Sequence, residues 1–287
     1  MDVFPSFIVG LGAGAIYATF GVLLTLMAML TRVINFAQVA VGVFAAYLSL
    51  SLVGAHGSPL GRAALSIAAA AAISVVVGWV VSRWLAQASA TARSAVTVAV
   101  LMGLLSLSSI LFGTRPQPLA PLFVGPAFSS GPIVVTKAGV AMLVLAVAIA
   151  GAARLLLSYT SVGIRLRAIS DHPRAAALLK VNVTGWQVAV WAFSGAVSGL
   201  AVFMLGSTQV SSASSMANLM VPAAAAALVG AFRSAELAIA GGLLIGGLQG
   251  LFTAFPQLVN LKDWVPILAV IVFLLWNQRK EKWDAAR

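Results

Sequence analysis

Residues 6–30 read SFIVGLGAGAIYATFGVLLTLMAML, an apolar stretch without a charged side chain. A helix rises about 1.5 Å per residue, so about 20 residues cross a hydrocarbon core of roughly 30 Å. The stretch is long enough to cross with residues to spare, and it is too long for the apolar region of a signal peptide. It predicts a membrane-spanning helix at the start of the chain.

Eight more apolar runs follow along the chain. The seventh and ninth runs are short for a crossing, and the seventh contains Pro222, which makes it a candidate re-entrant segment. We expect an all-α, polytopic transmembrane helix bundle of about eight or nine spans, with residues 1–287 forming a single transmembrane domain. The further runs are 34–53, 63–84, 94–113, 138–157, 186–208, 219–232, 235–255 and 264–276.

The composition argues against several classes of protein. Hydrophobic residues make up 61% of the chain and charged residues 8%, whereas a soluble domain has about 25% charged residues. Six acidic residues, two histidines and no cysteine leave little material for a metal site, a cofactor or acid–base catalysis. We therefore expect a protein that is not an enzyme and that needs no metal or cofactor.

The net charge of +11 is better explained by membrane orientation than by nucleic-acid binding. If all nine runs cross, the loops after the odd-numbered runs hold all but four of the 17 lysines and arginines. Basic residues gather on the cytoplasmic side of membrane proteins. This distribution predicts an external N-terminus and a cytoplasmic C-terminus. The four exceptions are Arg62, Arg115, Lys137 and Lys262.

Pairs of glycines four residues apart recur in the apolar runs. Small residues at this spacing let two membrane helices approach closely, so the pairs predict tight helix packing. The pairs are Gly10 and Gly14, Gly195 and Gly199, Gly242 and Gly246, and Gly246 and Gly250.

The loop at residues 158–185, SYTSVGIRLRAISDHPRAAALLKVNVTG, is the most charged connection. Its second half predicts a short helix, with Asp171 as a possible cap, Pro173 in the first turn and an alanine-rich body ending in a leucine pair. From the residues alone, this helix suits a groove on a partner protein and equally a place on anionic lipid head groups.

The same loop resembles the coupling loop of ATP-binding-cassette (ABC) importer permeases of the branched-chain amino acid type. That loop reads Gly-x-x-x-Arg-Ala, followed by Asn-Pro-Glu-Ala-Ala-x-Leu-Leu-Gly-Ile-Asn-Val. Residues 14–18, 33–37, 228–231 and 241–246 are similar to other stretches of the family, in the same order along the chain. The loop matches are Gly163, Arg167, Ala168, Pro173, Ala175, Ala176, Leu178, Leu179, Asn182 and Val183.

The resemblance implies a permease subunit of an importer in the cell's inner membrane, forming half of a pathway for branched-chain amino acids or similar small solutes. It implies a second permease subunit in a heterodimer, two ABC ATPase subunits and an external solute-binding protein; this chain has no phosphate-binding loop of its own. The ATPase-coupling residues would be Gly163, Arg167, Ala168, Asp171, Pro173, Ala175, Ala176, Leu178, Leu179 and Val181.

The chain departs from the family pattern in this loop. His172 replaces asparagine, Arg174 replaces glutamate and Lys180 replaces glycine. The coupling helix thus loses an acid and gains two bases, and we expect an ATPase partner with a more acidic groove. The candidate solutes are leucine-like and other amino acids, urea, short amides and other small solutes.

Polar residues inside the apolar runs are candidates for the substrate path, because an unpaired amide in hydrocarbon is costly. Asn35 and Gln38 stand three apart, which predicts one helical face, and Gln249 lies in the eighth run. The alternative role for each is a hydrogen bond between helices. The alternative function is a stand-alone secondary transporter or channel for a small neutral solute. It would need intramembrane acids, for which the chain offers almost only Glu236.

Overall fold

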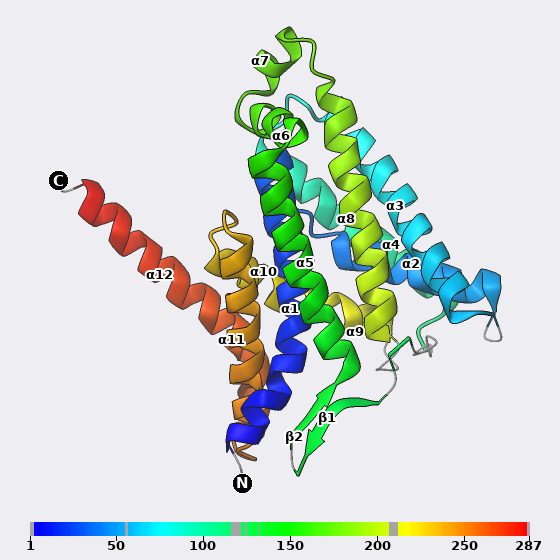
Figure 1. Ribbon diagram of the computed structural model, residues 1–287, viewed down its shortest axis with the longest axis vertical. Coiled ribbons are helices and arrows are strands. Elements are labelled where there is room, and N and C mark those ends of the chain that lie inside the picture. The colour runs from blue at the N-terminus through cyan, green and yellow to red at the C-terminus, as the bar shows by residue number, and fades with distance from the viewer. Residues whose placement is uncertain are drawn as a thin grey trace.

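The computed structural model describes residues 3–54, 57–115, 122–123, 125–131, 133–206 and 212–285, with the backbone alone for 214 and 277–285. Most of the long helices run side by side in an elongated bundle, whereas the C-terminal helix angles away from it (Figure 1). The long helices are α1 (Val3–Thr31), α2 (Gln38–Val53), α3 (Pro59–Trp84), α4 (Ala90–Phe112), α5 (Lys137–Tyr159), α8 (Val183–Gly206), α11 (Ala235–Thr253) and α12 (Val265–Ala285). The shorter elements are α6 (Ser161–Asp171), α7 (Pro173–Leu178), α9 (Ala213–Ala217), α10 (Met220–Val229), the 3-10 helix η1 (Val259–Trp264) and strands β1 (Pro126–Ser130) and β2 (Ile133–Thr136).

Within the described residues, seven helical segments are long and apolar enough to cross a membrane. Every predicted apolar run contains a helix, but α2 and the segment Ser215–Val229 are too short to count as spans. The ninth run was expected to be short, yet it reaches spanning length because η1 extends it toward the N-terminus. The protein is therefore a multi-pass helical membrane protein, with about seven spans by length and two shorter apolar helices.

The helical prediction has one exception among the described residues. Strands β1 and β2 form an antiparallel hairpin between α4 and α5, with an irregular register near Pro126. In Figure 1 the hairpin lies at the same end of the molecule as the N-terminus, whereas α6 and α7 lie at the other end. The hairpin therefore extends the bundle at the end opposite α6 and α7.

Helix α1 lies at the centre of the bundle and packs against α5, α8, α10 and α11. Its crossing with α11 brings two backbones into direct contact. A Cβ added at Gly14 would lie 2.9 Å from the Gly242 carbonyl oxygen, and one added at Gly246 would overlap the backbone of Gly14. The predicted close packing of the glycine pairs is confirmed at this crossing.

The outer helices keep large apolar side chains exposed. Without a partner chain, such surfaces suit lipid or a second membrane subunit rather than water. Examples on α4, α5 and α12 are Met102, Ile110, Val144, Leu155, Val272 and Trp276.

Candidate functional site

The corner between α5 and α6 positions the start of the predicted coupling loop, residues 158–185. Thr160 caps α6: its hydroxyl oxygen accepts the Gly163 N–H at 3.1 Å and donates to the Leu156 carbonyl at 2.6 Å. Gly163 is buried against α5, and a Cβ there would overlap the Leu156 carbonyl oxygen. Only glycine permits this tight corner, which gives the first motif residue a structural role.

Helix α6 is fixed to the end of α1. Leu166 and Ile169 are buried, and Leu166 joins a cluster that contains Met27 of α1. The Ser170 hydroxyl donates to the Met29 carbonyl at 2.5 Å. The next residue, Asp171, approaches Arg32 at 3.8 Å in an exposed ion pair. A displacement of α6 would therefore be transmitted to α1.

Helix α7 begins at Pro173, as predicted, but the predicted cap is wrong. Asp171 is the last residue of α6, and His172 occupies the cap position of α7 without a side-chain hydrogen bond. The His172 carbonyl instead accepts the Ala176 N–H at 3.0 Å. Asp171 could not cap α7 because α6 continues through it.

The end of α7 is a tight C-terminal motif. The Val181 N–H donates to the Ala176 carbonyl at 3.1 Å, and the Lys180 N–H donates to the Ala177 carbonyl at 3.0 Å. These are the two bonds of a Schellman motif, whose left-handed position favours glycine. Lys180 occupies that position with a φ of 61°. The departure from glycine noted in the sequence thus places a side chain in strained backbone.

The variant Lys180→Gly is expected to stabilise the end of α7 by about 1 kcal/mol, because it relieves the Cβ clash of a left-handed residue. Amide hydrogen exchange at Val181 should slow by about fivefold. Lys180→Ala is the matched control, since it removes the same charge and keeps the Cβ. Equal exchange in both variants would contradict this explanation.

Helix α7 carries its leucine pair on the surface of the protein. Leu178 is 86% exposed and Leu179 is 78% exposed, among the most exposed large apolar residues described. Ala176 is the buried residue of α7, whereas Ala175 is exposed. The result is a small apolar projection at the tip of the molecule.

The other predicted coupling residues surround this projection. Arg167 and Ala168 are exposed on α6, and the Ala168 carbonyl accepts the His172 N–H at 3.0 Å. Val181 is half-buried just after the Schellman turn. Arg174 donates to Gln87, between α3 and α4, at 2.7 Å. The loop is thus tied to two parts of the bundle, through α1 and through the α3–α4 connection.

Asn35 and Gln38 do not share one helical face, contrary to the prediction. Helix α2 begins only at Gln38, and Asn35 lies in the irregular connection before it. The Asn35 side-chain oxygen accepts the Ala37 N–H at 3.2 Å, a local bond that competes with the helix. The connection is also held by α4: Ser94 accepts the Ile34 N–H at 3.0 Å.

Thr97 of α4 is fully buried beside this connection. Its hydroxyl oxygen accepts the Phe36 N–H at 3.0 Å and lies 3.1 Å from the Ile34 carbonyl oxygen. Irregular backbone at membrane depth is tolerated only where such partners replace water. Thr97 therefore supports the break between α1 and α2.

The variant Thr97→Val is expected to lower the free energy of unfolding by about 1–3 kcal/mol, because it leaves the Phe36 N–H without a partner. Thermal unfolding in detergent measures the loss. Thr25→Val is the matched control: Thr25 is equally buried and donates to the Gly21 carbonyl of its own helix. Similar losses in both variants would count against a special role for Thr97.

The three predicted path residues do not meet in one site. Gln38 is 1% exposed, and neither polar atom of its side chain has a hydrogen-bond partner. Gln249 instead borders a cavity of about 560 Å³ between the start of α1 and the end of α11. It accepts the Tyr17 hydroxyl at 2.8 Å and donates to the Lys262 carbonyl at 3.2 Å. These two bonds link α11 to α1 and to η1, as the alternative role expects, while a place on the substrate path stays a prediction.

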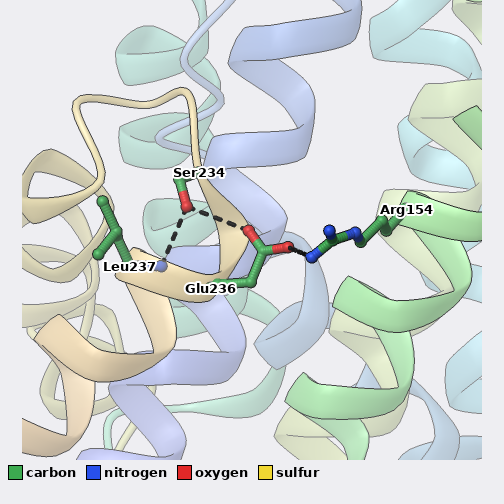
Figure 2. Close-up of polar contacts among 4 residues, drawn as sticks. All are labelled: Arg154, Ser234, Glu236 and Leu237. Carbon is green, nitrogen blue, oxygen red and sulfur yellow. Dashed lines mark hydrogen bonds and ion pairs between the residues drawn. The ribbon is translucent and has the colours of Figure 1, made fainter. Parts of the chain in front are cut away.

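Glu236 joins the start of α11 to α5, as Figure 2 shows. Arg154 of α5 donates to one Glu236 carboxylate oxygen at 3.2 Å. Ser234 donates to the other at 3.1 Å and caps α11 by accepting the Leu237 N–H at 3.2 Å. The acid is exposed and paired, which suits a link between helices.

Several anchoring residues escaped the sequence analysis. Gln87, Ser170 and Tyr17 each make a bond to a residue far away in the chain. Such bonds depend on which helices become neighbours, and no local pattern marks them. The predicted coupling residues were found through short-range spacing instead.

The family model and the named relative agree with the resemblance. A family model described as the permease component of the branched-chain amino acid transport system matches residues 6–275. A relative from Methanocaldococcus jannaschii, named a probable branched-chain amino acid transport permease protein LivH, is 27% identical over 249 residues, covering 81% of this chain and 75% of the relative. PsaBC from Streptococcus pneumoniae in complex with Fab aligns over 96% of this chain and 90% of that chain, with a TM-score of 0.43 and 15% identity. Because the family model spans most of the sequence, the chain belongs to the family of branched-chain amino acid transport system permease components.

Proposed function

We propose that this chain forms half of the transmembrane pathway of an ABC importer for branched-chain amino acids or similar small solutes. ABC permeases work with ATPase and binding-protein partners. For this chain we propose a heterodimer with a second permease subunit, two ATPase subunits and an external solute-binding protein. The observation that carries the proposal is the firmly anchored α7, which ends in the exposed pair Leu178 and Leu179.

An exposed apolar pair is stabilised when a partner covers it, and a short helix in a groove is a common form of protein recognition. The ATPase groove would receive Leu178, Leu179 and the exposed face of Ala175. Gly163, Pro173 and Ala176 would hold the helix in position, while Arg167, Ala168, Asp171 and Val181 frame it. Arg174 and Lys180 favour an acidic rim on the groove.

Force from the ATPase would reach the bundle by two routes. One runs through α6 to α1, by the Ser170 bond to Met29 and the packing of Leu166. The other runs from Arg174 to Gln87 at the α3–α4 connection. Moving these helices together would switch the permease between outward-facing and inward-facing arrangements, a two-state change biased from a distance.

The proposal requires α7 to be cytoplasmic and the N-terminus to be external. The two lie at opposite ends of the bundle in Figure 1, which supports this orientation once α7 is assigned to the ATPase side. The distribution of lysine and arginine supports the same choice. Asn35, Gln38 and Gln249 remain the proposed path residues, and opening of the path would have to expose the first two.

Reconstitution tests the proposal. The complete complex, purified through this chain and placed in lipid vesicles with its binding protein, should take up radiolabelled leucine only when ATP is supplied to the ATPase side. The isolated chain should give no uptake. Uptake by the isolated chain without ATP would instead support a secondary transporter or channel. If uptake by the complex depends on ATP, direct binding measurements on the solute-binding protein would identify the solute.

A further inference from the structure

A cavity of about 690 Å³ opens beside the coupling loop, at the end of the spans where α6 lies. Its walls come from the ends of α1 and α5, from α6, and from the connection between α10 and α11. Four arginines border it: Arg32, Arg154, Arg167 and Arg233. The cavity therefore concentrates positive charge where the apolar spans end, on the side of the bundle that carries α6.

The acids that border the cavity do not balance this charge. Asp171 pairs with Arg32 at 3.8 Å, and Glu236 pairs with Arg154 at 3.2 Å. Among the described residues, Arg167 and Arg233 have no carboxylate within ion-pair distance. Two exposed guanidinium groups thus remain available to an anion, and guanidinium groups bind phosphate oxygens through paired hydrogen bonds.

The inner wall of the cavity is apolar. Leu26, Leu30, Ala153 and Leu157 line it, and they also line a second cavity of about 270 Å³ between α1, α5 and α8. That second cavity is bordered by apolar side chains apart from Ser194, and its rim includes the exposed Phe193. A charged end beside an apolar slot matches a molecule with an anionic head and a hydrocarbon tail.

We propose that this cavity binds an anionic phospholipid, with its phosphate against Arg167 and Arg233 and its acyl chains along the apolar wall. Basic pockets between helices at a membrane surface select anionic head groups in this way. The site is separate from the leucine pair of α7, and lipid binding there needs no ATPase or transported solute.

Native mass spectrometry of the full-length chain, mixed with equal amounts of phosphatidylglycerol and phosphatidylcholine of the same acyl chains, tests the site. Phosphatidylglycerol should be retained preferentially. In Arg167→Gln/Arg233→Gln this preference should fall by about 30-fold, since each basic residue near the surface contributes about fivefold. The matched control, Arg83→Gln/Arg165→Gln, removes two exposed arginines that do not line the cavity and should retain the preference. Equal losses in both double variants would overturn the proposal.

A third variant, in which lipid retention is expected to rise, distinguishes loss of the binding site from loss of the fold. Asp171→Asn removes the carboxylate paired with Arg32 and should raise phosphatidylglycerol retention by about fivefold. A variant that merely disturbed the fold would not bind an anionic lipid more tightly. Unchanged or lower retention in Asp171→Asn would contradict the charge argument.

Competition separates a lipid from a free anion. Inorganic phosphate has the charge but no acyl chain, so a large molar excess should leave the retained phosphatidylglycerol in place at constant ionic strength. Displacement by phosphate at that ionic strength would show that the arginines alone make the site, and the lipid assignment would fail.

Discussion

The double variant Ala175→Asp/Leu178→Asp is expected to lose ATP-driven uptake while it still folds and inserts in the membrane. Both positions are exposed, with Leu178 at 86%, so the carboxylates stay in water in the free subunit. In an apolar groove they would lose that water without gaining a partner, which costs several kcal/mol. We therefore expect binding of the ATPase to weaken by about a thousandfold or more, since each 1.4 kcal/mol is tenfold.

Two measurements separate docking from folding. Detergent extraction and size-exclusion chromatography report the folded subunit, while co-purification reports the attached ATPase. Leu60→Asp is the matched control, because Leu60 is 76% exposed and lies in the first turn of α3, far along the chain from α7. The control should keep both ATPase and uptake.

The same experiment decides between the two roles left open for α7. A helix lying on lipid head groups would lose its place on the membrane after the aspartate changes, yet the ATPase would stay bound elsewhere. Retention of the ATPase together with normal uptake would rule out the proposed coupling function.

The sequence was most informative where a property depends on a continuous stretch of chain. Each apolar run contains a helix, and in seven of them the described residues supply the length and hydropathy that a crossing needs. The short helix after Pro173 followed from a proline suited to the first turn and from alanines behind it. The crossing of α1 and α11 was visible in glycines four residues apart.

Features that depend on distant partners could not be predicted. Helix α2 is short because hydroxyls of α4 hold the backbone at Ile34 and Phe36 in an irregular form. The sequence alone gave no reason to pair these residues with Ser94 and Thr97. The local sequence also gave a wrong prediction at Asp171. An acid two residues before Pro173 suggested a cap for α7, but α6 continues through Asp171.

Positive φ angles at residues other than glycine were equally hidden. Lys180 ends α7 in the left-handed region, and Ala231 ends α10 in the same way with a φ of 49°. At α10 the Phe232 N–H donates to the Ala227 carbonyl at 3.0 Å and the Ala231 N–H to the Leu228 carbonyl at 2.7 Å. Two helix ends thus share one motif, although neither has the glycine that usually marks it.

The variant Gly246→Ala is expected to disrupt the packing of α1 on α11. Its new methyl group would overlap the backbone nitrogen and Cα of Gly14 and lie 2.7 Å from the Gly10 carbonyl oxygen. Backbone atoms cannot turn aside as a side chain can, so the two helices must separate. Overpacking of this kind costs about 1–3 kcal/mol or more, and separation would also remove contacts along the rest of the crossing.

Gly12→Ala, on α1, the other helix of this crossing, provides a control in which no loss of stability is expected. A Cβ at Gly12 would meet no atom within 4 Å, so the variant should gain up to about 1 kcal/mol from alanine's higher helix propensity. Thermal unfolding in detergent should therefore shift downward for Gly246→Ala and stay level or rise for Gly12→Ala. If both shifts were downward and similar, the loss would reflect glycine content in general, and the backbone contact between α1 and α11 would not be what holds the centre of the bundle together.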